Sequence, residues 1–315
     1  MPKALAILLL SLSLSLALEA EVFKKTQDHS NIMSLSKADE ILLIGTDLGS
    51  VELFDLKEKK SAFYLQLAKI ENYYEKNVSP RVFSLDMQKD KVLILSEASF
   101  GGKNLNLLDQ NKKLQSKKLA FDSAKKAFLL DDDKVLLALS SARLILLDFS
   151  NLKVLKEYIF SHSSLNDAAL NEDKSKLVAG FESGEVKLFD LKSWQEVANF
   201  DQIHKDSVYS VDFKNSSVLS CATDRKVGLV QNGVQRFIER DFLIYTCALS
   251  ANASVFAFGD SSKNTLEIFS SSNLKRIKAF ENLNFSLEHI LFLDEKTLLV
   301  SGYNDTILIF TLNEG

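Results

Sequence analysis

The chain has 315 residues, of which 46% are apolar and 25% charged, and its formal net charge is −4. This composition excludes a wholly disordered chain, because enough apolar surface is available to build a core. It gives no basis for nucleic-acid binding, which needs a clustered basic surface. The lysine pairs at residues 112–113, 117–118 and 125–126 are interpreted as solvated strand ends and turns.

The first 17 residues are predicted to be an export signal. Lys3 supplies a positive start, residues 4–18 form an apolar run without charge, and Ala17 ends a small-residue cleavage site, with Ala20 as a second candidate. The run is shorter than the about 20 residues of a membrane-spanning helix. We therefore expect a periplasmic protein without a stable membrane anchor, whose mature domain covers residues 18–315. The alternative is an uncleaved, buried strand.

Residues 21–26 (EVFKKT) form the first expected strand, and no partner for it lies nearby in the sequence. After it, one pattern recurs seven times: an inner strand, a polar turn, a buried strand, a tight turn and a third strand, followed in the first six repeats by an outer strand. The third strands align on a bulky apolar residue at Phe54, Leu108, Leu147, Phe189, Val230, Phe269 and Phe310. These positions are 39–42 residues apart, except for 54 residues between the first two. A period near 40 is the length of one four-stranded propeller blade.

The second strands of the repeats are nearly continuous apolar runs, such as residues 40–46 and 134–140. This pattern fits strands that are covered on both faces by neighbouring blades, whereas a β-sandwich would show cleaner alternation and no fixed period. The seventh repeat stops at residues 306–312 without an outer strand, so residues 21–26 are predicted to pair there and close the ring. The predicted fold class is all-β, a seven-bladed β-propeller in a single domain, and we expect a monomer.

The long first interval predicts an insertion of roughly a dozen residues in the region 65–80. It places Tyr73 and Tyr74 beside charged residues and is followed by Arg81. Exposed tyrosine is favoured at protein interfaces, so these three residues are candidate partner contacts. The alternative is an amphipathic turn that packs on the first blade. Trp194, the only tryptophan, is a fourth candidate contact, with packing against a blade edge as its alternative.

The two cysteines, Cys221 and Cys247, both lie within apolar strand patterns. In an oxidising compartment they could form a disulfide. Two buried free thiols are an equal alternative, and the sequence leaves the choice open.

The repeats resemble those of WD-repeat propellers, best at residues 162–190 and 204–230. An ideal blade of that family holds a hydrogen-bonded set of His, Asp, Ser or Thr, and Trp. The resemblance implies such a set at His204, Asp224 and Ser220, with Val230 in the tryptophan position. It implies a more degenerate set at His162, where Ser183 replaces the aspartate and Phe189 the tryptophan.

The four histidines are not predicted to bind metal. His29, His162 and His204 precede the second strands of their repeats by 12–15 residues, which is the scaffold position of the repeat, and His289 lies within an inner strand as a lining or packed residue. No zinc, haem, phosphate-loop or G-x-S-x-G motif occurs. We therefore predict no catalytic residue, no cofactor and no metal.

Among exported propellers, the chain is similar to the NapL family of accessory proteins in periplasmic nitrate reductase systems. The resemblance implies a non-catalytic scaffold that binds nitrate reductase components or assembly factors, in maturation or electron supply. The alternative is a channel-site enzyme, or a propeller that binds a small ligand or a metal, such as a lactonase-like hydrolase.

Overall fold

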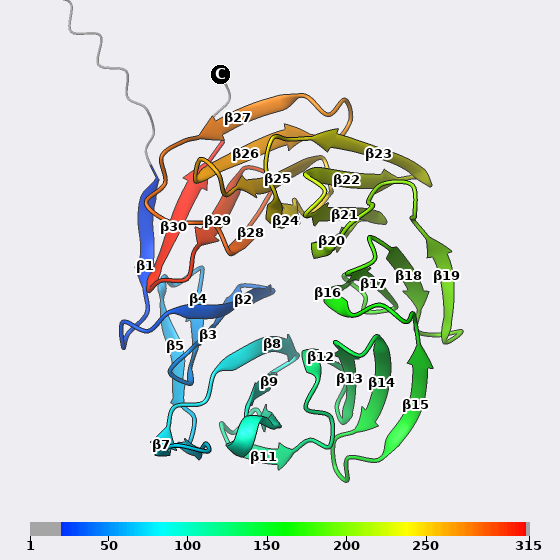
Figure 1. Ribbon diagram of the computed structural model, residues 1–315. Helices are drawn as coiled ribbons and strands as arrows, with labels where there is room; N and C mark the ends of the chain where they lie inside the picture. The colour runs from blue at the N-terminus through cyan, green and yellow to red at the C-terminus, as the bar shows by residue number, and fades with distance from the viewer. Residues whose placement is uncertain (1–19, 313–315) are drawn as a thin grey trace, which may run out of the picture.

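The computed structural model describes residues 20–312 and shows seven four-stranded antiparallel sheets arranged around a central axis (Figure 1). The predicted all-β, seven-bladed propeller is therefore confirmed. The predicted export signal at residues 1–17 lies outside the described residues.

The blades follow one another along the chain, and each runs from an inner to an outer strand. Blade 1 contains β2 (Ile32–Ala38), β3 (Ile41–Thr46), β4 (Ser50–Asp55) and β5 (Lys60–Gln66). Blade 2 contains β8 (Val82–Gln88), β9 (Lys91–Glu97), β10 (Lys103–Leu108) and β11 (Leu114–Lys118). Blade 3 contains β12 (Ala124–Asp131), β13 (Lys134–Leu139), β14 (Arg143–Asp148) and β15 (Val154–Ile159). Blade 4 contains β16 (Leu165–Leu170), β17 (Lys176–Phe181), β18 (Val186–Asp190) and β19 (Gln195–Asn199).

The second half of the ring has the same organisation. Blade 5 contains β20 (Val208–Lys214), β21 (Ser217–Ala222), β22 (Lys226–Gln231) and β23 (Val234–Glu239). Blade 6 contains β24 (Ile244–Leu249), β25 (Val255–Asp260), β26 (Thr265–Ser270) and β27 (Arg276–Phe280). Blade 7 contains β28 (His289–Phe292), β29 (Thr297–Ser301), β30 (Thr306–Thr311) and β1 (Glu21–Lys25). Outside the blades lie a hairpin of β6 (Ile70–Glu71) and β7 (Lys76–Val78), and the 3₁₀ turn η1 (Ser99–Gly101).

The N-terminal strand closes the ring as predicted. β1 pairs antiparallel with β30 and becomes the outer strand of blade 7. Its Lys24 ammonium lies 3.0 Å from the buried Glu52 carboxylate of blade 1. The rings of Phe23 and Phe54 meet edge to face, with their centroids 5.5 Å apart. The strand therefore links the last blade to the first by both hydrogen bonds and side-chain contacts.

The blades pack face to face through the apolar middle strands. β3, β9, β13, β17 and β21 are buried over most of their lengths. At Gly180 the next blade comes so close that an added Cβ would lie 2.6 Å from Cγ1 of Val208, and Gly45 faces Val82 in the same way at 2.5 Å. Only glycine permits this separation between the blades.

Aspartates on the inner strands connect neighbouring blades. The inner strands diverge from one another around the axis and belong to separate sheets, so their backbones form no shared ladder. Asp86, Asp167 and Asp212 instead accept backbone N–H bonds from the inner strand of the next blade, at Leu129 (2.6 Å), Val211 (3.0 Å) and Leu249 (2.8 Å). Each carboxylate satisfies a donor that would otherwise be left without a partner near the axis.

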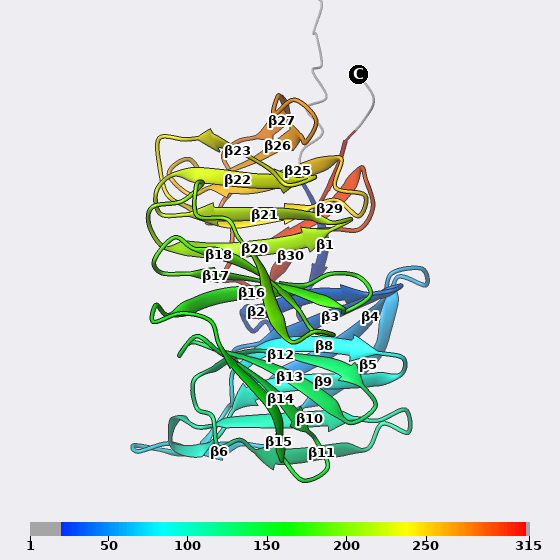
Figure 2. The same cartoon turned by 90° about the vertical axis from the view of Figure 1, so that its right-hand side faces the viewer.

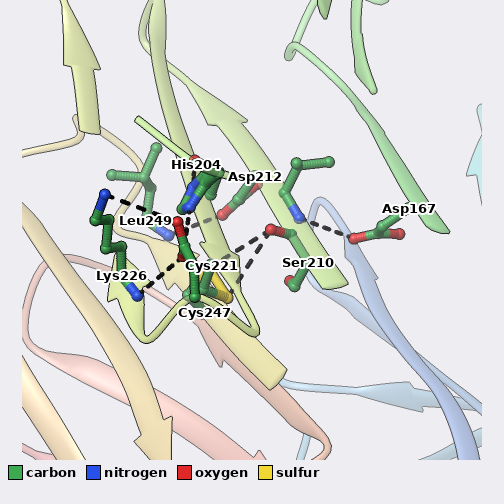
Figure 3. Close-up of a disulfide and its surroundings, with 11 residues drawn as sticks. Asp167, His204, Ser210, Asp212, Cys221, Lys226, Cys247 and Leu249 are labelled. Carbon is green, nitrogen blue, oxygen red and sulfur yellow. Dashed lines mark hydrogen bonds and ion pairs between the residues drawn. A yellow bond between two sulfur atoms is a disulfide. The ribbon is translucent and has the colours of Figure 1, made fainter. Parts of the chain in front are cut away.

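A disulfide joins blades 5 and 6 (Figure 3). It connects Cys221 on β21 with Cys247 on β24, whose Cα atoms are 6.3 Å apart. Both cysteines are buried, and the bridge lies beside the contact that Asp212 makes with the backbone of Leu249. Of the two alternatives that the sequence left open, the structure shows the bridge.

The order of strands gives the propeller two different faces. The loops that lead from one blade to the next lie on the same face as the turns between the second and third strands, because neighbouring strands are antiparallel. We call this the connection face. Within residues 20–312, no helix has the length and apolar character needed to cross a membrane.

Candidate functional site

The inner strands surround a central cavity of about 560 Å³. Its wall includes Tyr209 and Tyr245, whose rings meet edge to face at 4.9 Å. Lys126 forms an ion pair with Asp167 at 3.1 Å, and this carboxylate also accepts the Val211 N–H bond. The cavity is large enough for a small ligand.

His289 lines this cavity from β28, as the sequence suggested for an inner-strand residue. Burial and the nearby Lys126 ammonium lower the pKa of His289 from 6.5 to about 4, although the ring also hydrogen-bonds the backbone of Ile32. The imidazole is therefore neutral at pH 7. Within residues 20–312, no three His, Cys, Asp or Glu side chains come together in a group that could hold a metal ion.

The structure brings together the three scaffold residues implied at His204. The Nδ1 atom of His204 lies 3.0 Å from Asp224 and Nε2 lies 2.8 Å from the Ser220 hydroxyl. Burial opposes ionisation of Asp224, but its hydrogen bond and charge interaction with His204 lower the pKa of the carboxyl overall. The chain of three side chains ties the turn after β21 to the loop that enters blade 5, so it supports the connection face without being exposed on it.

His162 and His29 are placed differently from that scaffold position. His162 is exposed, and in its blade Ser161 and Ser183 both donate to Glu185 at 2.8 Å, which corrects the implied set. A carboxylate two residues after the expected aspartate position has taken over as acceptor. His29 is also largely exposed, and it lies 3.0 Å from Asp305 across the closing seam.

The predicted insertion between blades 1 and 2 is the hairpin β6–β7 on the connection face. The Asn72 side chain caps its turn by accepting the N–H bonds of Tyr74 (2.8 Å) and Glu75 (2.7 Å). Tyr73 is 78% exposed and Tyr74 94% exposed. The alternative interpretation required the tyrosines to pack on blade 1, and they do not. The hairpin extends outward at the edge of the molecule, as the labels β7 in Figure 1 and β6 in Figure 2 show.

Arg81 follows the hairpin and is fixed in place. Its guanidinium forms two hydrogen bonds to Glu97, at 3.1 and 3.3 Å, and this pairing raises the pKa of Arg81. About half of the Arg81 side chain remains exposed, so it can also contact a partner. Bidentate pairing holds the charge in one orientation.

Trp194, in contrast, is packed between two blades. Its indole N–H donates to the carbonyl of Glu157 in β15 at 3.2 Å, and its ring meets that of Phe189 edge to face at 5.3 Å. The side chain covers part of the outer edge of β15, a position where an unpaired carbonyl would otherwise face solvent. The packing interpretation of Trp194 therefore fits the structure better than the contact interpretation.

Three exposed apolar residues on the connection face were not predicted from the sequence. The ring of Phe100 contacts that of Tyr73, with centroids 5.3 Å apart. Leu48 lies in the turn between β3 and β4. The hydroxyl of Tyr303 donates to the Asp47 carboxylate at 3.0 Å. All three stand in turns between second and third strands, where polar residues are the usual choice. A large apolar residue in such a turn is the signal that could have identified them.

Comparisons with known proteins support the fold. No established protein-family profile matches the sequence. Over 266 residues, or 78% of this chain, it is 22% identical to WD repeat-containing protein 91 of Danio rerio; the match covers 32% of that protein, so the chain spans about a third of its length. The crystal structure of the Myceliophteria thermophila Cps50 (Swd1) β-propeller domain superposes with a TM-score of 0.72 and 14% identity, covering 93% of this chain and 100% of that domain. Both similarities support a WD-repeat-like seven-bladed β-propeller.

Proposed function

We propose that the chain is an exported, non-catalytic scaffold that binds another protein through its connection face. The observation that carries the proposal is the exposure of Tyr73 and Tyr74 on a hairpin that the propeller does not need for its own closure. Tyrosine supplies a large, stiff contact area at low entropic cost, and tyrosine and arginine are enriched among the residues that dominate binding energy. Arg81 and Phe100 extend the same surface.

The periplasmic location is part of the same proposal. It is supported by the charge-free apolar run at residues 4–18, which has the character of an export signal. The disulfide between Cys221 and Cys247 also supports it, because such bridges persist in oxidising compartments and are rare in the cytosol.

The partner we propose is a component or assembly factor of a periplasmic nitrate reductase system, which this chain would support in maturation or electron supply. This finer assignment rests on the general similarity of the repeats to the NapL family. In such a role the chain itself carries no redox group, and its contribution is the placement of a partner.

Affinity capture tests this function. The full-length protein is used to capture partners from periplasmic extract of its own source organism, and the captured proteins are identified by mass spectrometry. The proposal expects nitrate reductase subunits or their assembly factors, and expects the Tyr73→Ala/Tyr74→Ala variant to bind them at least about 30-fold more weakly. Ile159→Ala is the control, since Ile159 is also exposed, at 62%, but lies on the outer strand of blade 3. Undiminished capture by the double variant would remove the hairpin from the interface.

The central cavity supports a second candidate function, the binding of a small ligand or catalysis in the channel. Its motivation is the pair of tyrosines and the neutral His289 around a space of about 560 Å³. Stoichiometric calcium or zinc in the purified protein would favour a metal-dependent hydrolase. The donor groups of the described residues do not favour such a site.

A further inference from the structure

Five asparagines of the chain begin an Asn-x-Ser/Thr triplet: Asn77, Asn215, Asn252, Asn284 and Asn304. None of the middle residues is proline. In exported proteins this triplet is the acceptor signal for the attachment of a glycan to the asparagine amide. Because the triplet alone is a weak signal, the local structure must distinguish a usable acceptor from the others.

Asn77 lies at an irregular position of the exposed β6–β7 hairpin. β6 and β7 pair at Ile70–Val78 and at Glu71–Lys76, so Asn77 is the additional, unpaired residue of a β-bulge. Its backbone has a φ of 68°, its side chain is exposed, and no hydrogen bond to its amide is found within residues 20–312. The amide nitrogen is therefore free to react.

The hairpin around Asn77 also permits local opening. A two-stranded hairpin of two to three residues per strand is only marginally stable by itself. Its β6 side is attached to blade 2 by the bond from the Glu71 N–H to the Ser99 hydroxyl and by the Tyr73–Phe100 contact, whereas within residues 20–312 no such bond is found for β7, which carries Asn77. The hydroxyl of Ser79, the third residue of the triplet, is contacted by the exposed ammonium of Lys69, which a transferase can displace. The segment can thus adopt the extended conformation that an enzyme site requires.

Three of the other triplets are held within the propeller. The Asn215 amide donates to the carbonyl of Asn252 at 2.9 Å, and Ser217 is buried. In the second triplet, Ser254 donates to Glu295 at 2.7 Å. In the triplet of Asn304, Thr306 donates to Asp305 at 2.6 Å. In each case a triplet side chain already serves a turn or a blade contact.

Asn284 is the closest competitor, since its side chain is exposed and forms no hydrogen bond within residues 20–312. Its loop is anchored, however, because the Leu283 N–H bonds to the carbonyl of Asn264 and the Ser286 hydroxyl donates to the Asn264 side chain at 3.3 Å. Phe285, the middle residue of the triplet, packs into the core between blades 6 and 7. This triplet cannot leave the surface without exposing apolar side chains, so it is a matched control for Asn77.

A nearby charge separates Asn77 from the other four asparagines. Glu75 precedes it by two residues and is exposed, whereas the corresponding positions of the other triplets carry no acidic residue. A carboxylate beside the acceptor can be recognised by a cationic group of a transferase, which adds selectivity through charge complementarity.

We propose that Asn77 is an N-glycosylation site of this protein, and that the donor is a lipid-linked glycan activated as a pyrophosphate. The Nδ2 atom of Asn77 attacks the anomeric carbon, and a C–N bond forms while the C–O bond to the pyrophosphate breaks. The lipid pyrophosphate leaves with the electron pair, the amide nitrogen loses one proton to a base of the transferase, and no oxidation occurs. The inference rests on the export step of the proposed function, because such donors face the exported compartment.

The position of the glycan has a consequence for partner binding. Asn77 lies on β7, whereas Tyr73 and Tyr74 lie in the turn of the same hairpin. A glycan would therefore flank the proposed contact surface and restrict the directions from which a partner can approach. Glycan attachment and partner capture can be measured separately, since the first depends on Asn77 and the second on Tyr73 and Tyr74.

Mass spectrometry of the full-length protein tests the site. The protein is isolated from the exported fraction of a host that contains an oligosaccharyltransferase, and its intact mass and glycopeptides are measured. We expect one added glycan in the wild type and in Asn284→Gln, and none in Asn77→Gln. Ser79→Ala retains Asn77 but removes the hydroxyl of the triplet, and we expect it to abolish attachment as well. Unmodified wild-type protein with its leader removed would overturn the proposal, as would attachment at another asparagine.

A second measurement separates this proposal from the export proposal. Folded, purified protein is incubated with a purified oligosaccharyltransferase and its lipid-linked oligosaccharide, alongside a peptide with a known acceptor triplet. Modification of Asn77 in this reaction supports the site even if the leader is retained in cells, which would count against export alone. If the peptide is modified and the protein is not, the proposed site is wrong. The partner-capture experiment on Tyr73 and Tyr74 is independent of this outcome.

Discussion

The disulfide between blades 5 and 6 allows a quantitative test of how the ring is stabilised. Cys221 and Cys247 are separated by 26 residues, and the bridge restricts that loop in the unfolded chain. Loop-closure entropy for a loop of this length gives about 3.5 kcal/mol at 25 °C. Because both cysteines are buried and the bond joins neighbouring blades, we expect most of this free energy to appear in the stability of the folded protein.

The comparison that isolates the bond is oxidised against reduced wild-type protein, since the side chains are then otherwise the same. Guanidinium unfolding followed by circular dichroism should show a free energy of unfolding that is lower by about 3.5 kcal/mol after reduction. The Cys221→Ala/Cys247→Ala variant should resemble the reduced form and should not respond to the reductant. A thiol count on denatured, unreduced protein should find no free thiol. Coincident unfolding curves for the oxidised and reduced protein would refute the reasoning.

Substitutions at Lys24, His204 and His289 test three further features of the ring, with Lys25 as a control position. Lys24→Ala leaves the buried Glu52 carboxylate without its ion-pair partner and should cost about 3 kcal/mol in the free energy of unfolding; Lys25→Ala, on the exposed side of the same strand, should cost less than about 0.5 kcal/mol. His204→Ala leaves the buried Ser220 hydroxyl without its partner and removes one of the hydrogen bonds to Asp224, which keeps those from the Lys205 and Lys226 N–H groups. It should lower the free energy of unfolding by about 3 kcal/mol, measured by urea denaturation. The pKa of His289 is about 4 in the folded protein and near 6.5 in the unfolded chain, so the unfolded chain binds the proton first and stability should fall as the pH drops from 6.5 to 4. In His289→Gln the unfolding midpoint should depend less on pH over that range. A pH dependence equal to that of the wild type would contradict the lowered pKa of His289.

The propeller could be predicted from the sequence because its signals are local and repeated. Each blade needs an apolar strand that is covered on both faces, and this requirement recurs as a run such as residues 134–140 at a period near 40. The closing role of β1 followed from counting, since the seventh repeat lacked an outer strand and residues 21–26 lacked a partner. The insertion between blades 1 and 2 followed in the same way from the one long interval, whereas its hairpin structure did not.

The side-chain contacts between blades could not be predicted in this way. His162 and His204 occupy similar positions in their repeats, yet only His204 is buried in a three-residue hydrogen-bonded set. The difference depends on a single acceptor, because Glu185 serves the blade of His162 from a neighbouring position. The hydrogen bond from the Trp194 indole to the Glu157 carbonyl likewise depends on the preceding blade, and no local sequence pattern predicts it.

The sequence by itself determined the number of blades, the order of the strands and the position of the insertion, since these depend on alternation and spacing along the chain. Only the tertiary structure decided that Cys221 and Cys247 meet, that Asp167 bonds to the next blade, and that Asn77 is an unpaired bulge residue. The physical reason is that curvature of the ring fixes the distance between side chains on different blades. That distance is a property of seven sheets packed together and has no counterpart in the spacing of residues within any one of them.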